Sequence, residues 1–133
     1  MNWKYIKPLN SEKLIDDFEQ LVCYFFPNEF KSCVRLNNGG RPAYKRFDTD
    51  KNIGREIKSF LSFNFNDKET VWKIYEWNEE ELSNKYIAFA IDNFGNLICF
   101  DSKNDGVVFF NHENSTIELI ASSFVEFMNL LYK

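Results

Sequence analysis

Apolar residues recur every three or four positions in the first part of the chain, which is the spacing of an amphipathic helix. This stripe contains Leu14, Ile15, Phe18, Leu21, Val22 and Phe25. Ser11 precedes the stripe and is predicted to cap the helix. Pro27 ends it and can serve as the first turn of a second helix, whose inward-facing residues are Phe30, Cys33 and Val34. The segment LNNGG at 36–40 ends the second helix, because Asn and Gly tolerate the left-handed conformation found there.

The periodicity changes after Pro42. Tyr44 and Phe47 predict a short strand, which the turn residues of DTDKNIG end. Residues 55–65 predict one longer strand with one buried face. The apolar side chains of that face are Ile57, Leu61, Phe63 and Phe65. Helical spacing returns in residues 67–82, through Val71, Ile74 and Tyr75.

Three short strands follow, at about 86–91, 97–100 and 107–111. The connectors DNFGN and DSKNDG carry the Asn, Asp and Gly residues that tight antiparallel turns require. A last helix is predicted from the spacing of Phe124, Phe127, Met128 and Leu131. Ser123 and Glu126 form an S-x-x-E capping box at its start.

Adjacent strands with turn-length connections predict an α+β fold, in which a single antiparallel sheet is flanked by N-terminal and C-terminal helices. Residues 1–133 are expected to form one domain, since the chain shows no repeat, low-complexity tract or linker. Hydrophobic residues make up 44% of the chain and aromatic residues 18%, which is ample for a buried core.

Charge is unevenly distributed along the chain. The net charge is −4, but residues 1–66 hold eleven Lys/Arg against eight Asp/Glu, whereas residues 67–133 hold five against twelve. The overall sign disfavours nucleic-acid binding, and the acidic half suits a cationic protein partner. An RNA-binding domain that uses the basic stretch from Lys31 to Lys58 is the weaker alternative. No signal peptide or membrane span is predicted from residues 1–10 or from the longest apolar run, so we expect a soluble, cytoplasmic protein.

Candidate catalytic and metal-binding residues are few. His112 is the only histidine, and no motif places a nucleophile beside it, which favours an exposed turn residue. Cys23, Cys33 and Cys99 contain no C-x-x-C pair and are predicted to be buried, reduced thiols. Residues 36–42, LNNGGRP, follow a helix and lack the G-K-[ST] ending of a phosphate loop. We therefore expect no enzyme activity, no cofactor and no metal.

Asp92 and Asp101 are the strongest candidates for a pair of catalytic carboxylates. Each follows a predicted strand and can accept hydrogen bonds from the N–H groups of the turn that comes after it. Gly95 supplies the positive φ angle of the first turn. A strand rises about 3.3 Å per residue, so the two carboxylates should lie well over 10 Å apart. Paired acid–base catalysis needs roughly 10 Å or less, and the pattern therefore predicts a hairpin.

Acidic residues gather at the end of the predicted helix 67–82. Glu79, Glu80 and Glu81 oppose the helix dipole there, at a cost of a few tenths of a kcal/mol each. A solvated helix end is the simpler interpretation, but a cationic partner would give these side chains a function. Together with Glu76 and Asp105 they are the predicted partner-binding residues.

The string IAFAIDNFGNLICFDSKNDGVVFF at 87–110, followed by ASSFVEFMNLL at 121–131, resembles the SUKH superfamily. The matching residues are Phe89, Ala90, Asp92, Gly95, Asn96, Phe100, Asp101, Ser123, Phe124 and Phe127. Upstream, Pro27, the NNGG segment with Gly39 and Gly40, and residues 57–63 also fit. Ala88 departs from the pattern, because many members have proline there.

This resemblance spans residues 11–131 and implies an α+β fold without enzyme activity. In bacteria it implies an immunity protein that binds and neutralises a toxin, often a nuclease or deaminase. The implied partner is then a cognate polymorphic toxin domain with a basic surface. The fungal branch of the family, which regulates cell-wall synthesis, suggests the alternative of a housekeeping module that binds a cellular protein.

Overall fold

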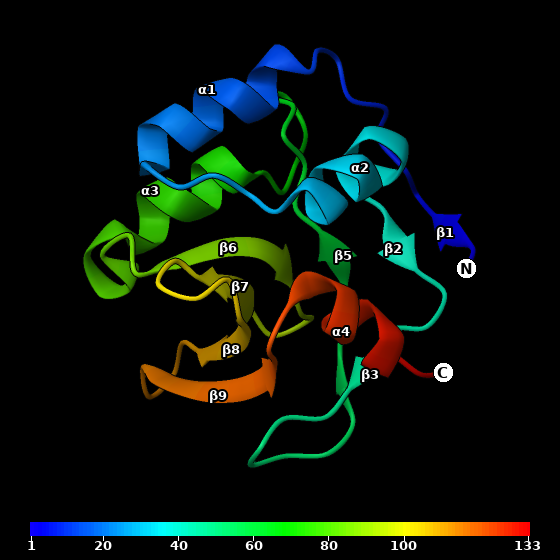
Figure 1. Ribbon diagram of the computed structural model, residues 1–133, viewed down its shortest axis with the longest axis vertical. Coiled ribbons are helices and arrows are strands. Elements are labelled where there is room, and N and C mark those ends of the chain that lie inside the picture. The colour runs from blue at the N-terminus through cyan, green and yellow to red at the C-terminus, as the bar shows by residue number, and fades with distance from the viewer.

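The computed structural model describes residues 1–133 and contains four helices and a five-stranded antiparallel sheet (Figure 1). The sheet follows the order of the chain and consists of β5 (Ser59–Phe60), β6 (Tyr86–Ile91), β7 (Leu97–Asp101), β8 (Val107–Asn111) and β9 (Thr116–Ala121). The helices are α1 (Lys13–Val22), α2 (Asn28–Asn37), α3 (Val71–Leu82) and α4 (Phe124–Leu130). The predicted α+β fold, with helices flanking an antiparallel sheet, is confirmed.

Two small two-stranded ladders accompany the main sheet. β1 (Trp3–Lys4) pairs with β2 (Arg41–Pro42), and β3 (Arg46–Phe47) pairs with β4 (Arg55–Glu56). β3 falls in the strand predicted at Tyr44 and Phe47, and β4 falls in the strand predicted over residues 55–65. β1 and β2 were not predicted, because strands of two residues are too short to show an alternation of apolar and polar side chains in the sequence.

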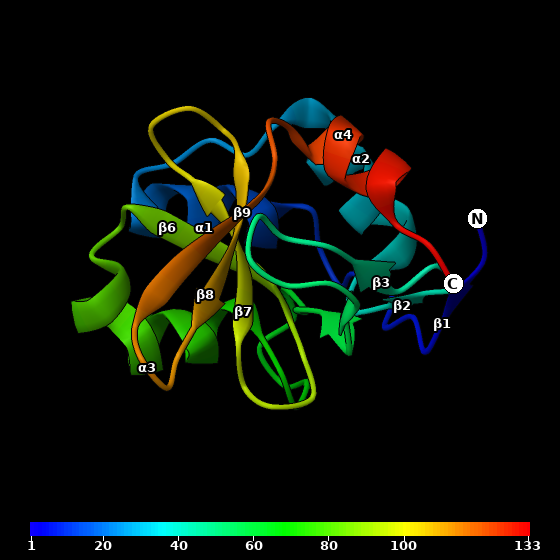
Figure 2. The ribbon, with the colours of Figure 1, turned by 90° about the horizontal axis from the view of Figure 1, so that it is seen from below.

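The helices pack in two pairs, which both views of the ribbon separate clearly (Figures 1 and 2). α1 meets α3 where the ring of Phe18 lies edge-on to Trp72, at 5.1 Å between centroids. α2 meets α4 through the rings of Phe30 and Phe124, at 5.3 Å. None of the four helices is long and apolar enough to cross a membrane.

The core is a single cluster rich in phenylalanine. The ring centroids of Phe89 on β6 and Phe100 on β7 lie 4.5 Å apart. The ring of Phe30 on α2 stands edge-on to both, with centroid distances of 5.3 Å to Phe89 and 5.2 Å to Phe100. Edge-to-face contacts of this kind add to the free energy of simple burial. The fully buried rings are Phe18, Phe30, Phe47, Phe63, Phe89, Phe100, Phe109 and Phe127.

The predicted buried stripe of α1 is wrong at its end. Leu21 and Phe25 are exposed, at 47% and 80%. The helix stops at Val22 because Cys23 adopts a left-handed conformation, with φ at 55°. Beyond that point the chain is extended, so Phe25 points outward while its two neighbours are buried. The predicted Ser11 cap is also wrong, because the N-cap residue is Glu12 and no side chain caps the helix. Ser11 Oγ only accepts a hydrogen bond from the N–H of Lys13, at 3.2 Å.

The single strand predicted over residues 55–65 is also wrong. The segment is divided between β4, which pairs with β3, and β5, which pairs with β6. Ile57, Leu61 and Phe63 are buried as expected, whereas Phe65 is 56% exposed and stacks on Trp72. Apolar spacing reported burial correctly, but it did not reveal the change of partner strand.

The apolar pattern did not predict β9, because this strand buries a charged residue and exposes an apolar one. Glu118 is buried at 4% exposure and the next residue, Leu119, is 61% exposed. Only one half of the predicted α4 capping box is formed: Ser123 Oγ accepts a hydrogen bond from Glu126 N at 3.1 Å. The Glu126 carboxylate accepts from the N–H and hydroxyl of Ser122 instead of from Ser123.

Candidate functional site

α3 carries four of the five predicted partner-binding residues. Thr70 caps the helix, and its Oγ1 accepts a hydrogen bond from Lys73 N at 3.1 Å. Its inner face is buried through Val71, Ile74 and Leu82. The helix ends at Ser83, whose left-handed backbone directs its N–H to the Glu79 carbonyl at 2.9 Å.

The opposite face of α3 is exposed and acidic. Glu76, Glu79, Glu80 and Glu81 are all exposed, and none of them forms a salt bridge. Glu81 accepts one hydrogen bond, from the hydroxyl of Ser115 at 2.7 Å. Glu79 and Glu80 are neighbours of Glu76 on the helix surface by their spacing of three and four, and Glu81 lies beside this group. We call these four exposed residues the α3 acidic face.

Trp77 also lies on the exposed side of α3 and is 71% exposed. Glu80 and Glu81 are three and four residues further along, so they are its neighbours on the helix surface. Sequence reasoning missed this tryptophan. The available signal was its position off the apolar stripe of Val71 and Ile74.

Folding alone does not favour this arrangement. The last turn of α3 contains no basic residue, and glutamates near a helix C-terminus oppose the dipole. Glu76 and Glu80 are spaced i,i+4, where like charges repel by about 0.2–0.5 kcal/mol. Each penalty is small, but all act in the same direction.

Asp105, the fifth predicted partner-binding residue, is used differently. It lies between β7 and β8, and its Oδ1 accepts a hydrogen bond from the Tyr24 hydroxyl at 2.7 Å. Burial, followed by this hydrogen bond, raises the pKa of Tyr24 well above its ordinary value. No hydrogen bond or ion pair joins Asp105 to the α3 acidic face.

The carboxylate oxygens of Asp92 accept hydrogen bonds from residues of the turn that follows it. Asp92 is 6% exposed and accepts from Phe94 N and Asn96 N, both at 2.8 Å, and from Asn96 Nδ2 at 2.9 Å. Gly95 has a φ of 86°, as a tight turn requires. Asp101 pairs with Tyr86 at the opposite end of the hairpin, so the two aspartates do not form one site.

The two motif glycines have different roles. Gly39 has a φ of 68°, a conformation that L side chains rarely adopt. At Gly40 a Cβ atom would lie 2.9 Å from the Asn37 carbonyl oxygen and 3.2 Å from the Trp3 ring. Gly40 therefore lets the N-terminal segment pack closely on the turn after α2.

His112 and the cysteines show no arrangement for nucleophilic chemistry. His112 is exposed, and its Nε2 lies 2.8 Å from the Phe94 carbonyl oxygen. This contact links the turn at His112 to the turn at Phe94.

All three cysteine thiols are free. Burial raises the pKa of Cys33 to about 11 and that of Cys99 further, whereas Cys23 is exposed, contrary to prediction, because α1 ends there. No group of three or more His, Cys, Asp or Glu side chains could hold a metal ion.

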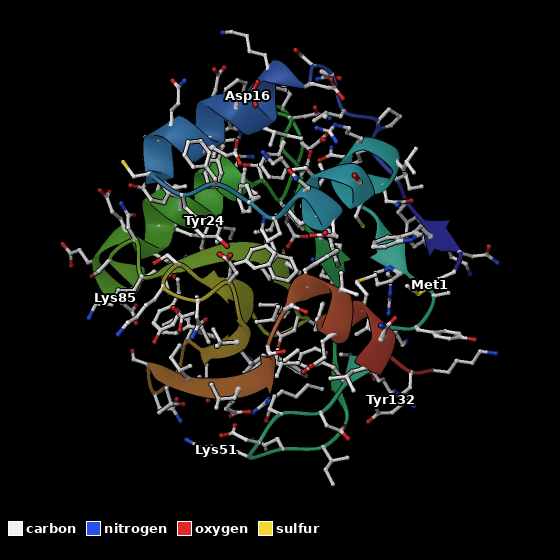
Figure 3. The ribbon with its side chains drawn as sticks, viewed as in Figure 1. Met1, Asp16, Tyr24, Lys51, Lys85 and Tyr132 are labelled. Carbon is white, nitrogen blue, oxygen red and sulfur yellow. The ribbon has the colours of Figure 1, made fainter.

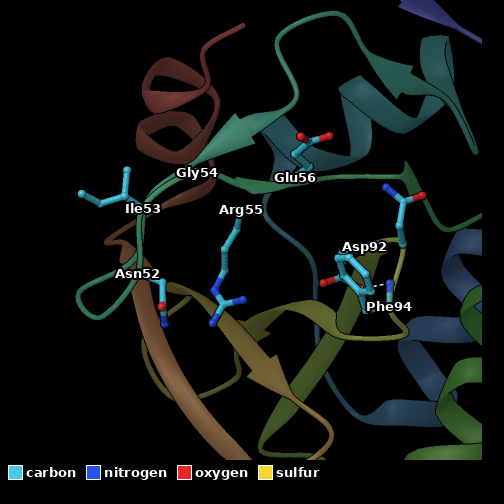
Figure 4. Close-up of a pocket in the computed structure, with 8 residues that line it drawn as sticks. Asn52, Ile53, Gly54, Arg55, Glu56, Asp92 and Phe94 are labelled. Carbon is cyan, nitrogen blue, oxygen red and sulfur yellow. Dashed lines mark hydrogen bonds between the residues drawn. The ribbon is translucent and has the colours of Figure 1, made fainter.

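A second exposed surface lies between the β3–β4 loop and the β6–β7 turn (Figure 4). Ile53 and Phe94 are 86% and 79% exposed on either side of a cavity of about 420 Å³. Figure 4 shows Ile53 pointing away from the molecule and Arg55 pointing toward the sheet. An apolar residue at the tip of each polar turn was the sequence signal for this surface.

The basic stretch considered for RNA binding is largely neutralised. Six of its eight basic residues form salt bridges with carboxylates: Lys31, Arg35, Lys45, Arg46, Arg55 and Lys58. Cations held in this way are less free to displace counterions from phosphates. The structure therefore gives the RNA-binding alternative little support.

Comparison with known proteins adds one match. The model of the SMI1 / KNR4 family (SUKH-1) matches residues 9–130, which is nearly the whole chain. No curated protein matches the chain.

Proposed function

The chain belongs to the SMI1 / KNR4 family (SUKH-1), and from this premise we propose that it is an immunity protein. The family match confirms the resemblance seen in the sequence motifs, and the family includes toxin-immunity proteins. The proposed activity is to bind and neutralise a cognate toxin domain of the nuclease or deaminase type in the cytoplasm. It uses protein–protein contact and no catalysis, and residues 1–133 act as one domain.

The α3 acidic face is the observation that supports this proposal. Its four carboxylates have no cationic partner within the chain, so their charge is available to another protein. A nuclease is basic around its substrate groove, because it must bind phosphates. Complementary charge speeds the encounter of two proteins, and an exposed tryptophan such as Trp77 is a frequent energetic centre of interfaces.

Co-expression with the product of the immediately upstream gene, which the proposal expects to carry a toxin domain, tests it. We expect the chain to restore growth, to form a stable complex with that domain and to block its activity in vitro. A chain in which Glu79, Glu80 and Glu81 are changed to lysine should protect less well. If the folded wild-type chain neither binds the toxin domain nor protects the cell, the proposal fails and a housekeeping interaction module becomes the better interpretation.

A further inference from the structure

The N-terminal ladder forms a second charged surface, and it lies on the opposite side of the molecule from the end of α3 (Figures 1 and 3). In Figure 3 the labels Met1 and Lys85 mark the two sides. The register of β1 and β2 places Lys4 directly opposite Arg41. Like charges in that position destabilise an antiparallel pair, and neither side chain forms a salt bridge. Folding therefore does not explain this pair of cations.

Lys4 and Arg41 line a hollow of about 320 Å³ together with Tyr5, Pro42, Ala43 and Lys45. Three of these residues are cationic, and no Asp or Glu is among them. Only Lys45 has a carboxylate partner, Glu56 at 3.5 Å. The volume lies at the lower end of the roughly 300–1,000 Å³ that small-molecule sites occupy.

Tyr5 adds an aromatic ring to this hollow at some conformational cost. Its φ is 58° and the residue is 70% exposed. A bulky side chain rarely adopts a positive φ, and strain of this kind concentrates at functional sites. Since the ring is not buried in the core, its packing does not offset the strain.

The hollow is held firmly against the core. The ring of Trp3 stands edge-on to Phe60 at 5.0 Å, and the Lys7 N–H donates to the Asn38 carbonyl at 2.8 Å. The close approach at Gly40 locks the same segment. A site whose groups are already in place loses less entropy on binding.

We propose that this hollow binds a nucleoside phosphate. Lys4, Arg41 and Lys45 hold the phosphate oxygens, for which the planar guanidinium of Arg41 offers two parallel donors. Tyr5 stacks on the base, as aromatic side chains do in many nucleotide-binding proteins. An acidic peptide would engage the cations but would leave the strained Tyr5 unexplained. A long RNA would need a path of free cations, which the paired basic residues do not supply. This site is independent of the toxin-binding proposal.

Calorimetric titration of the full chain with ATP, AMP, adenosine and inorganic phosphate tests the inference. We expect ATP to bind at least tenfold more tightly than either adenosine or phosphate alone. The double change Lys4→Gln and Arg41→Gln should weaken ATP binding at least tenfold, and Tyr5→Gly at least fivefold. Neither variant should melt at a lower temperature, because the first removes a like-charge pair and the second relieves a positive φ.

Lys51→Gln is the matched control, because Lys51 is an exposed basic residue without a salt bridge and lies far from Met1 in Figure 3. It should leave ATP binding unchanged. The inference is overturned if ATP does not bind at millimolar concentration or if the variants bind it as well as the wild type does. It is equally overturned if an oligo-glutamate peptide or a single-stranded RNA oligonucleotide binds this face more tightly than ATP.

Discussion

Arg55 and Glu118 form a two-point ion pair, with an Nε–Oε1 distance of 3.0 Å and an Nη2–Oε2 distance of 2.8 Å. Thr49 and Asn52 donate to the same carboxylate, at 2.6 and 3.1 Å. The Arg55 guanidinium also lies 4.0 Å from the centroid of the Phe109 ring. One buried carboxylate on β9 therefore fixes the whole β3–β4 loop against the edge of the sheet.

The Glu118 site predicts an acid-sensitive fold. Burial by itself raises the pKa of Glu118. The hydrogen bonds from Arg55, Thr49 and Asn52 lower the pKa by more than burial raises it, so the pKa lies below the ordinary value of 4.5. A carboxyl whose pKa is depressed by folding contributes stability above its unfolded pKa, and that contribution is lost as pH falls through the folded pKa. Urea unfolding should show stability falling below about pH 5. Glu118→Gln should flatten this dependence, whereas Glu113→Gln, at an exposed position, should not.

Removing Arg55 should be more damaging than removing a surface arginine. Arg55→Ala leaves a buried carboxylate without its cation, and we expect a loss of about 3 kcal/mol in the free energy of unfolding. Arg35 pairs with Glu12 at 2.8 Å, but both side chains are exposed, so Arg35→Ala should cost less than about 1 kcal/mol. Equal losses in the two variants would show that the Glu118 cluster contributes no more than a surface pair.

The stability of the turn between β6 and β7 should depend more on the backbone conformation of Gly95 than on the charge of Asp92. Gly95→Val forces a β-branched residue into a φ of 86° and should cost about 3 kcal/mol. Its Cβ would also lie 3.5 Å from His112 Nε2. Asp92→Asn should cost less, about 1–2 kcal/mol, because Oδ1 still accepts from two backbone N–H groups and only the bond from Asn96 Nδ2 is lost. Thermal unfolding measures both. Two folded variants that had lost only function would instead assign these residues to an active site.

Tyr24 should act on stability and not on partner binding. Tyr24→Phe removes the hydroxyl that donates to Asp105, and we expect a loss of about 1 kcal/mol in the free energy of unfolding. The affinity for the toxin domain should stay unchanged in the same variant. A variant that keeps its stability but loses affinity would return Asp105 and its surroundings to the interface.

Most of the fold could be predicted because apolar spacing reports burial directly. The stripe at Phe124 and Phe127 and the apolar run of β6 are examples, and both lie in the core. The pattern failed where a polar group is buried through distant partners. Glu118 on β9 can be buried because Arg55, 63 residues earlier in the chain, pairs with it and Thr49 and Asn52 donate to it, and no local periodicity contains that information.

The candidate site was predicted in part for a similar reason. Residues four positions apart are neighbours on a helix, so Glu76 and Glu80 share a face whatever the tertiary structure. Asp105 depends on the hydrogen bond from Tyr24, and the hollow at Lys4 depends on the pairing of residues almost 40 positions apart. Trp77 was missed although its position off the apolar stripe of Val71 and Ile74 indicated exposure.

The α3 acidic face should control how fast the partner is captured. Changing Glu79, Glu80 and Glu81 to lysine should lower the association rate with the toxin domain at least tenfold, because it reverses the charge that steers the encounter. Steering acts over a Debye length of about 8 Å at physiological salt, so the wild-type rate should also fall as salt rises. The melting temperature should stay nearly unchanged, since these carboxylates form no salt bridge and lysine near a helix C-terminus suits the dipole. Glu29→Lys, at an exposed site on α2, is the control and should change the rate less than about twofold.

Trp77→Ala should act instead on the dissociation rate, as the loss of a packed anchor does. Surface plasmon resonance at low and high salt measures both rates. A rate indifferent to the triple reversal and to salt would place the interface elsewhere, with the cavity between Ile53 and Phe94 as the next surface to test.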